Sequence, residues 1–170
     1  GFYTVASSIK EWKKMKLTYL RNRIEIKVRR AQLSDAERIW EIRNEPESRA
    51  VATSPEIIPL PQHVDWFKRK YLEQDGNFCF IGEIGEKVAG YCRFDLKDDK
   101  YLNSIAVASS MHGRGIGTLL LGQSIKQLNT GKPIHAEIRR HNIASVKIFE
   151  RNGFKKISED KANFYYQLKN

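Results

Sequence analysis

The sequence predicts a mixed α/β domain, and three features of the chain support this prediction. Segments with an apolar residue at every second position, which is typical of strands, are interspersed with segments at helical spacing. Two strand-like runs flank a short turn, and a glycine cluster separates another strand from a leucine-rich helix. The 170 residues are 41% hydrophobic and 29% charged, which suits a globular domain and excludes collagen-like or fully disordered chains.

The first half of the chain is expected to form one strand and two helices. Ile24, Ile26 and Val28 alternate with charged residues, as in a strand with one buried face. Ser34 and Glu37 have the spacing of a capping box, which satisfies free backbone donors at a helix start. The expected elements are a strand over 23–30, a helix that ends before Pro46, a proline-rich loop over 46–61, and a helix over 61–74 with Val64, Phe67, Tyr71 and Leu72 inward.

The second half is expected to alternate between strands and helices. A turn over 84–87 joins strands at 78–81 and 88–94 into a hairpin. The remaining elements are a strand over 103–108, a helix from the glycine cluster to about Gly131, a strand over 134–138, a helix from Asn142 to Asn152, and strands over 154–158 and 164–168.

The net charge of +10 is concentrated at the N-terminus. Residues 1–30 hold nine Lys or Arg and two Glu, so seven of the ten net positive charges lie there. We expect 1–22 to be a basic helix or linker, with a helix over 9–20, that connects to an upstream domain or docks on this one. A helix for a membrane surface or for nucleic acid is the alternative. The body, 23–170, is expected to form the main domain and is only mildly basic, so no nucleic-acid partner is expected.

Cysteine usage and hydropathy favour a cytoplasmic protein. No run approaches 18 apolar residues, so no membrane partner is expected. Cys79 and Cys92 lie in apolar strands without metal-binding spacing, and they are expected to be buried, reduced thiols. No metal is expected.

The most informative segment is the glycine cluster, Gly113, Gly115 and Gly117, between a strand and a helix. Glycines let the backbone approach a ligand closely, and amides at a helix start are free donors at the positive end of the dipole. Such a loop can hold a phosphate or diphosphate, although a purely structural turn is the alternative. It is neither a Walker loop nor a good Rossmann fingerprint, because no Gly-Lys-Ser/Thr follows and the glycines alternate late in the chain.

These residues resemble the GNAT superfamily of acetyltransferases. His112 to Gly117 matches the family's Arg/Gln-x-x-Gly-x-Gly/Ala signature, with His in the first position. Asn142 to Phe154 resembles a second family element, which ends in an aromatic residue, Glu, two further residues and Gly-Phe. The resemblance covers about 24–168 and implies a mostly antiparallel, splayed central sheet flanked by helices, with acetyl-CoA as co-substrate.

The resemblance also implies where acetyl-CoA binds. The diphosphate would lie on the loop amides and the pantetheine arm along the preceding strand. The implied cofactor residues are Ile105, Ala106, Val107, His112, Gly113, Arg114, Gly115, Ile116, Gly117, Thr118, Asn142 and Phe149.

In this superfamily the amine attacks the thioester directly. A general base and an oxyanion donor are needed, and the candidate bases are Glu137 and His63. Phe149 stands where the family usually has a tyrosine that protonates the thiolate. We expect Tyr165, Tyr166 or a water to replace it, unless protonation is dispensable.

A finer resemblance concerns the acceptor. Residues 40–46 and 61–67 are similar to acetyltransferases of bacterial nucleotide-sugar pathways, nearest to the pseudaminic acid type. This implies a UDP-amino sugar as acceptor, with Arg43, His63 and Trp66 lining its pocket. Alternatives are a protein N-terminal amine of the ribosomal-protein type, a polyamine, or a non-catalytic acyl-CoA-binding module. The sequence leaves the oligomeric state open, a dimer included.

Overall fold

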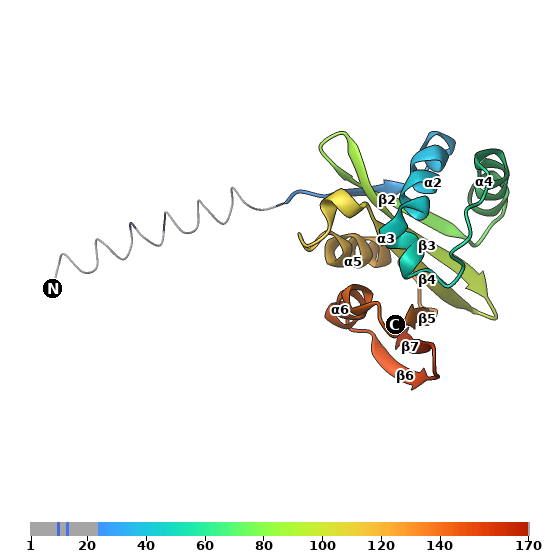
Figure 1. The fold of residues 1–170 in the computed structure, drawn as a ribbon. Helices are drawn as coiled ribbons and strands as arrows, with labels where there is room; N and C mark the ends of the chain where they lie inside the picture. Colours follow the sequence, from blue (N-terminus) through green and yellow to red (C-terminus); the bar gives the residue numbers. More distant parts are fainter. Residues whose placement is uncertain (1–9, 11–12, 14–23, 170) are drawn as a thin grey trace.

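The computed structural model describes residues 10, 13 and 24–169 of the chain (Figure 1). The helix expected over 9–20, and with it the linker expected over 1–22, lies outside these residues except at Lys10 and Lys13. The domain expected from residue 23 is described from residue 24 onward.

Within the part of the chain that the structure describes, seven strands form one sheet, which confirms the mixed α/β fold (Figure 1). Their order is β1-β2-β3-β4-β5-β7-β6, and all neighbours are antiparallel except β4 and β5, which are parallel. The strands are β1 (Lys27–Arg30), β2 (Phe78–Ile84), β3 (Lys87–Lys97), β4 (Lys100–Val107), β5 (Ile134–Arg139), β6 (Lys155–Glu159) and β7 (Asn163–Leu168).

Helices cover both faces of this sheet (Figure 1). Helices α2 (Ala36–Asn44) and α4 (Leu60–Phe67) bury their apolar residues in one core with β2 and β3. Helices α5 (Ile116–Leu128) and α6 (Ile143–Arg151) pack into the second core on the opposite face. Short helix α3 (Pro46–Ala50) follows α2 directly. Burial of apolar side chains on both faces therefore fixes the sheet between two helical layers.

The sheet splits between β4 and β5. The two strands pair over three positions, from Tyr101 opposite Ile134 to Asn103 opposite Ala136. Beyond Asn103, β4 continues to Val107 and pairs only with β3 on its other side. The backbone groups on this part of β4 are thus free to pair with an extended ligand.

Two predicted boundaries are wrong. The loop predicted over 46–61 contains α3, because Pro46 stands at the first helical position, where its fixed φ and missing N–H favour a helix. The strand predicted over 23–30 begins only at Lys27, where pairing with β2 begins.

The predicted capping box of Ser34 and Glu37 does not form. A 3₁₀ turn precedes α2 instead, and the Asp35 carboxylate accepts the N–H of Gln32 at 2.7 Å. Arg29 donates to both oxygens of Asp35, at 2.7 and 2.8 Å. Burial opposes the charge, but Arg29 and the Gln32 N–H hold the pKa of Asp35 below its ordinary value.

Leu72 was predicted to point inward and is 42% exposed. Helix α4 continues as a π-helical segment over Lys68–Glu73, whose turn is wider than that of an α-helix. Tyr71 remains buried at 3% exposure, while the changed phase of the helix turns Leu72 outward.

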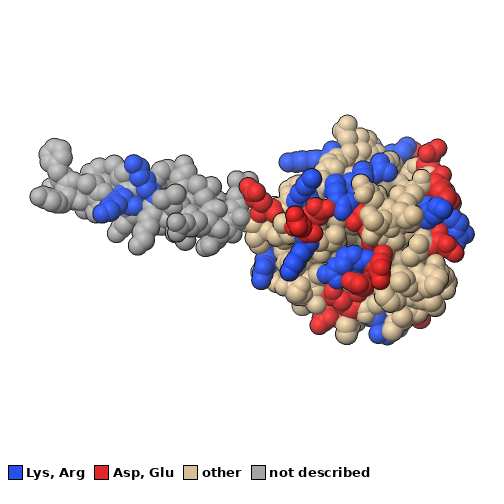
Figure 2. Space-filling view, turned by 90° about the horizontal axis from the view of Figure 1, so that it is seen from above, with Lys and Arg blue, Asp and Glu red and all other residues tan. Residues whose placement is uncertain are grey.

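The surface of the described domain carries mixed charges. On the face shown in Figure 2, Lys and Arg side chains are interspersed with Asp and Glu. None of the described helices is long and apolar enough to cross a membrane. Within the same residues, no three His, Cys, Asp or Glu side chains cluster in a way that could hold a metal ion.

Candidate functional site

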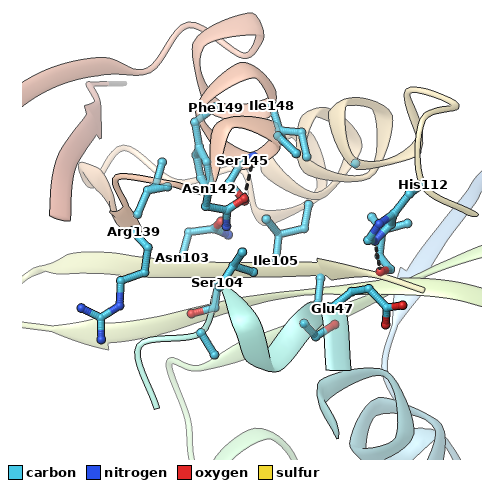
Figure 3. A pocket seen from close by; sticks show the side chains of 18 of the residues that line it. Glu47, Asn103, Ser104, Ile105, His112, Arg139, Asn142, Ser145, Ile148 and Phe149 are labelled. Carbon is cyan, nitrogen blue, oxygen red and sulfur yellow. Dashed lines mark hydrogen bonds between the residues drawn. The ribbon is translucent and has the colours of Figure 1, made fainter. Parts of the chain in front are cut away.

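A cleft of about 670 Å³ opens along the free part of β4 (Figure 3). Ser104 and Ile105 of β4 form its floor, α6 lies on one side with Phe149, and α3 lies on the other with Glu47. The cleft thus lies where the sheet splits, and both helical layers contribute to its walls.

One end of the cleft is a loop of bare backbone. Gly113 and Gly115 have φ values of 77° and 74°, and a Cβ at either would meet no heavy atom within 4 Å. Helix α5 begins at Ile116 without a side-chain cap or an acidic residue in its first turn. Free amides and the positive end of the helix dipole therefore face open space that a diphosphate fits.

Two side-chain hydrogen bonds fix elements that border the cleft (Figure 3). His112 Nε2–H donates to the carbonyl of Val107 at 2.8 Å, which joins the loop to the end of β4. Asn142 Oδ1 accepts the N–H of Ser145 at 3.2 Å and caps α6, so the predicted helix start is confirmed. A Cβ at Gly117 would overlap a side chain of α6, so the glycine allows α5 and α6 to approach closely.

Phe149 lines the cleft where the family usually has a tyrosine. It is 2% exposed and packs on Phe154, with ring centroids 4.9 Å apart. Tyr165 and Tyr166 donate hydrogen bonds to carboxylates at 2.7 and 3.1 Å, and neither tyrosine lines the cleft. Both hydroxyls are thus committed to partners outside the cleft.

Sequence reasoning missed Tyr91, the one tyrosine among the described residues that line the cleft. It lies on β3 opposite Ala106, and no described residue hydrogen-bonds its hydroxyl. Burial raises the pKa of Tyr91, so the hydroxyl stays protonated near neutral pH and has a proton to donate. Its place at the cleft follows from the register of β3 and β4, which cannot be derived from the sequence alone.

The other end of the cleft is cationic. No described residue offers Arg43 a hydrogen bond or an ion pair, and burial lowers the pKa of its guanidinium. Arg93 accompanies it, bonded to the Tyr71 hydroxyl at 3.0 Å and 3.8 Å from Asp95. Burial opposes the charge of Arg93, but Tyr71, Tyr91 and Asp95 together hold its pKa above the ordinary value. Two positive charges thus persist beside a space that a substrate can enter.

Glu137 reaches the same cleft from β5. Its neighbours Ala136 and Ile138 are buried, and Glu137 is exposed on the opposite side of the strand, as predicted. The Asn163 amide donates to Glu137 Oε1 at 3.0 Å. The second carboxylate oxygen has no hydrogen-bond partner among the described residues and can accept a proton.

His63 and Trp66 lie apart from the main cleft, in a second cavity of about 260 Å³ that Arg43 also lines. His63 is 1% exposed, and its Nε2–H donates to the carbonyl of Ala36 at 2.9 Å. Burial lowers the pKa of His63, so the ring is neutral near pH 7. The Trp66 ring lies 5.3 Å from the Arg93 guanidinium and is already a cation–π partner.

Ten of the residues predicted for the cofactor line the cleft: Ile105, Ala106, Val107, His112, Gly113, Gly115, Ile116, Gly117, Asn142 and Phe149. The side chains of Arg114 and Thr118 do not line it. Cys79 and Cys92 are buried free thiols, as predicted. Burial raises both pKa values, that of Cys92 to about 12, so neither thiol is a nucleophile near neutral pH.

Solved structures with the same fold are numerous among acetyltransferases. An N-acetyltransferase from Staphylococcus aureus Mu50 is 21% identical with a TM-score of 0.71, covering 85% of this chain and 98% of that chain. A ribosomal-protein-alanine N-acetyltransferase from Brucella melitensis is 20% identical with a TM-score of 0.72, covering 85% and 99%. An aminoglycoside acetyltransferase, AAC(6')-Ib, solved with coenzyme A, is 15% identical with a TM-score of 0.72, covering 85% and 95%. At these identities the likeness concerns the fold.

The family itself is shown by sequence. A search of curated proteins found none that matches. The family model described as the Acetyltransferase (GNAT) family matches residues 36–154, which is more than half of the chain and includes the glycine loop and α6. The chain therefore belongs to the acetyltransferase (GNAT) family and is an acetyl-CoA-dependent N-acetyltransferase.

Proposed function

We propose that this enzyme transfers the acetyl group of acetyl-CoA to the primary amine of a nucleotide-linked amino sugar. The observation that carries the proposal is Arg43, a half-buried guanidinium at the cleft that makes no hydrogen bond or ion pair with any described residue. A desolvated cation of this kind is best compensated by a phosphate or carboxylate of the ligand, and the planar guanidinium binds such groups in a bidentate manner. The resemblance of residues 40–46 and 61–67 to nucleotide-sugar acetyltransferases supports the same acceptor.

The cofactor would bind along the cleft from the glycine loop to the split in the sheet. The amides of Gly113, Gly115, Gly117 and Thr118 hold the diphosphate, and Arg114 pairs with a further phosphate from the rim. The free edge of β4 over Ile105 to Val107 pairs with the pantetheine arm, beside Phe149. When bound, the cofactor supplies an activated acetyl group.

The residues of the chain divide the proton transfers between them. Glu137 removes the proton from the acceptor ammonium, directly or through a water, so that the free amine can attack. A backbone N–H on the free edge of β4 stabilises the negative charge on the carbonyl oxygen. Tyr91 donates a proton to the departing thiolate in place of the tyrosine that Phe149 replaces. His63 is neutral and buried in the second cavity, where it binds the acceptor more readily than it acts as the base.

Two other acceptor classes fit the cleft less well. Five Lys or Arg and two Glu line it, so polycationic acceptors such as polyamines meet like charge. A protein N-terminal amine carries less charge and is the second candidate, supported by the fold shared with the ribosomal-protein-alanine enzyme.

Thiol release from acetyl-CoA tests the proposal, with a UDP-4-amino sugar, an N-terminal alanine peptide and spermidine as acceptors. We expect turnover on the UDP-amino sugar. Arg43→Gln should raise its KM by about tenfold or more, because a charge-assisted hydrogen bond is lost, while the affinity for coenzyme A stays unchanged. Arg38→Gln is the matched control, since Arg38 lies on the same helix and pairs with Glu41 on the surface.

Turnover restricted to the peptide or to spermidine would refute the nucleotide-sugar acceptor. Tight coenzyme A binding without turnover on any of the three amines would refute all three acceptor classes.

A further inference from the structure

The second cavity has an unusual set of walls. Three arginines line it, Arg43 from α2, Arg69 from the π-helical segment and Arg93 from β3, and no carboxylate of a described residue does. Arg43 and Arg93 also line the main cleft, so the two spaces adjoin at these side chains. The cavity therefore adjoins the cationic end of the cleft at a pair of guanidinium groups.

Most donors of these arginines are uncommitted among the described residues. Arg43 has no hydrogen bond or ion pair there, and Arg69 makes only a long bond, 3.4 Å, to the carbonyl of Asp65. Arg93 uses Nη1 toward Tyr71, with Asp95 3.8 Å away, and no described residue hydrogen-bonds its other donors. Like charges so close repel one another, and an anion placed between them removes that repulsion.

His63 adds a hydrogen-bond acceptor to the same cavity. Because Nε2–H is committed to the carbonyl of Ala36, Nδ1 of the neutral ring carries a lone pair. Nδ1 is buried and has no partner among the described residues. An orphaned buried acceptor beside three cations is satisfied by a ligand that offers both anionic oxygens and one O–H or N–H donor.

We infer that the second cavity is a phosphoryl-binding subsite of the acceptor site, in which Arg69 and Arg93 join Arg43. The ligand is the phosphate or diphosphate group of the acceptor, with a P–OH or neighbouring hydroxyl donating to His63 Nδ1. Gln62 adds a neutral polar side chain, and the Trp66 ring forms an apolar wall whose cation–π contacts steady the guanidinium groups. In one respect this rests on the proposed function, because the ligand is taken to be part of the acceptor.

Titration calorimetry on the protein saturated with coenzyme A tests the subsite, since the coenzyme then occupies the glycine loop. The probes are inorganic pyrophosphate and UDP, with uridine as the neutral comparison. We expect pyrophosphate and UDP to bind, and Arg69→Gln to weaken both by about tenfold. Lys68→Gln is the matched control, because it removes a neighbouring charge that does not line the cavity, and it should change either affinity by less than about twofold.

Arg69 is exposed and lines only the second cavity, so its replacement leaves the fold and the main cleft intact. Arg93→Lys keeps a charge but loses the planar fork, and it should weaken pyrophosphate binding as well. Absence of pyrophosphate and UDP binding to the wild type, or equal binding by Arg69→Gln, overturns the subsite. If the anions bind but UDP-amino sugars are not acetylated, the subsite stands and the proposed acceptor is refuted. If UDP-amino sugars are acetylated and Arg69→Gln does not change the rate, the proposed acceptor stands and the subsite is refuted.

Discussion

Glu137 of β5 and Tyr91 of β3 line the same cleft but differ in what they can do with a proton. Glu137 is exposed and accepts one hydrogen bond, from Asn163. Tyr91 is buried, which raises its pKa and keeps the hydroxyl protonated. One side chain is thus equipped as a base and the other as an acid, and their strands lie on opposite sides of the split between β4 and β5.

Glu137→Gln should lower kcat by about 10²- to 10⁴-fold with the UDP-amino sugar, because the amide cannot accept the ammonium proton. The residual rate should rise with pH as solution equilibrium supplies the free amine. Tyr91→Phe, in comparison, should lower kcat without this pH recovery. Steady-state kinetics from pH 6 to 9 distinguishes the two. A Glu137→Gln enzyme with wild-type kcat across that range would exclude Glu137 as the base.

At the scale of elements, Arg29 joins β1 to the start of α2 and to β2. It bonds both oxygens of Asp35 and also pairs with Glu83. The pKa of Asp35 lies below its ordinary value of 3.8, since the bonds from Arg29 and Gln32 outweigh burial. Stability from this carboxylate is therefore fully present above pH 3.8 and is lost as the pH falls through the lower folded-state pKa.

Arg29→Gln should reduce the free energy of unfolding at pH 7 by about 1–3 kcal/mol, because the Asp35 carboxylate remains buried without its charged partner. The difference from wild type should shrink as the pH falls through the lowered pKa of Asp35, because the carboxyl is then protonated. Urea unfolding at several pH values measures this. Arg38→Gln, which breaks an exposed pair, should cost about 0–1 kcal/mol. A pH-independent difference for Arg29→Gln would contradict the account of this ion pair.

Helices and strands with regularly spaced apolar residues could be predicted, because that spacing in the local sequence indicates which face of the element is buried. Helix α3 is not predicted, because the four prolines over 46–61 indicate a loop, whereas Pro46 in fact occupies the first turn of the helix, which proline suits. The inward position predicted for Leu72 is wrong, because the prediction assumes α-helical spacing and the π-helical turn has more residues per turn.

The candidate site was predictable only in part. The glycine loop is local in sequence, so the cofactor end of the cleft could be assigned from the residues. The grouping of Arg43, Arg69 and Arg93 depends on packing α2 and the π-helical segment against β3, which no local pattern states.

At the scale of the whole molecule, the cleft links the two helical layers through the split between β4 and β5. The glycine loop belongs to the layer of α5 and α6, and Arg43 belongs to the layer of α2 and α4. Under the proposed function, a donor bound from one layer and an acceptor held by the other would therefore meet at the part of β4 that β5 leaves unpaired.

This arrangement depends on coenzyme A binding to the bare backbone before α5, and titration calorimetry of coenzyme A tests that directly. Gly115→Val should abolish measurable binding, because the side chain would fill the open space over the amides. Gly85→Val is the matched control: Gly85 also has a positive φ, of 61°, and open space around its Cβ position, but it lies in the turn between β2 and β3. The account predicts wild-type affinity for Gly85→Val and none for Gly115→Val. Wild-type affinity in a folded Gly115→Val protein would contradict it.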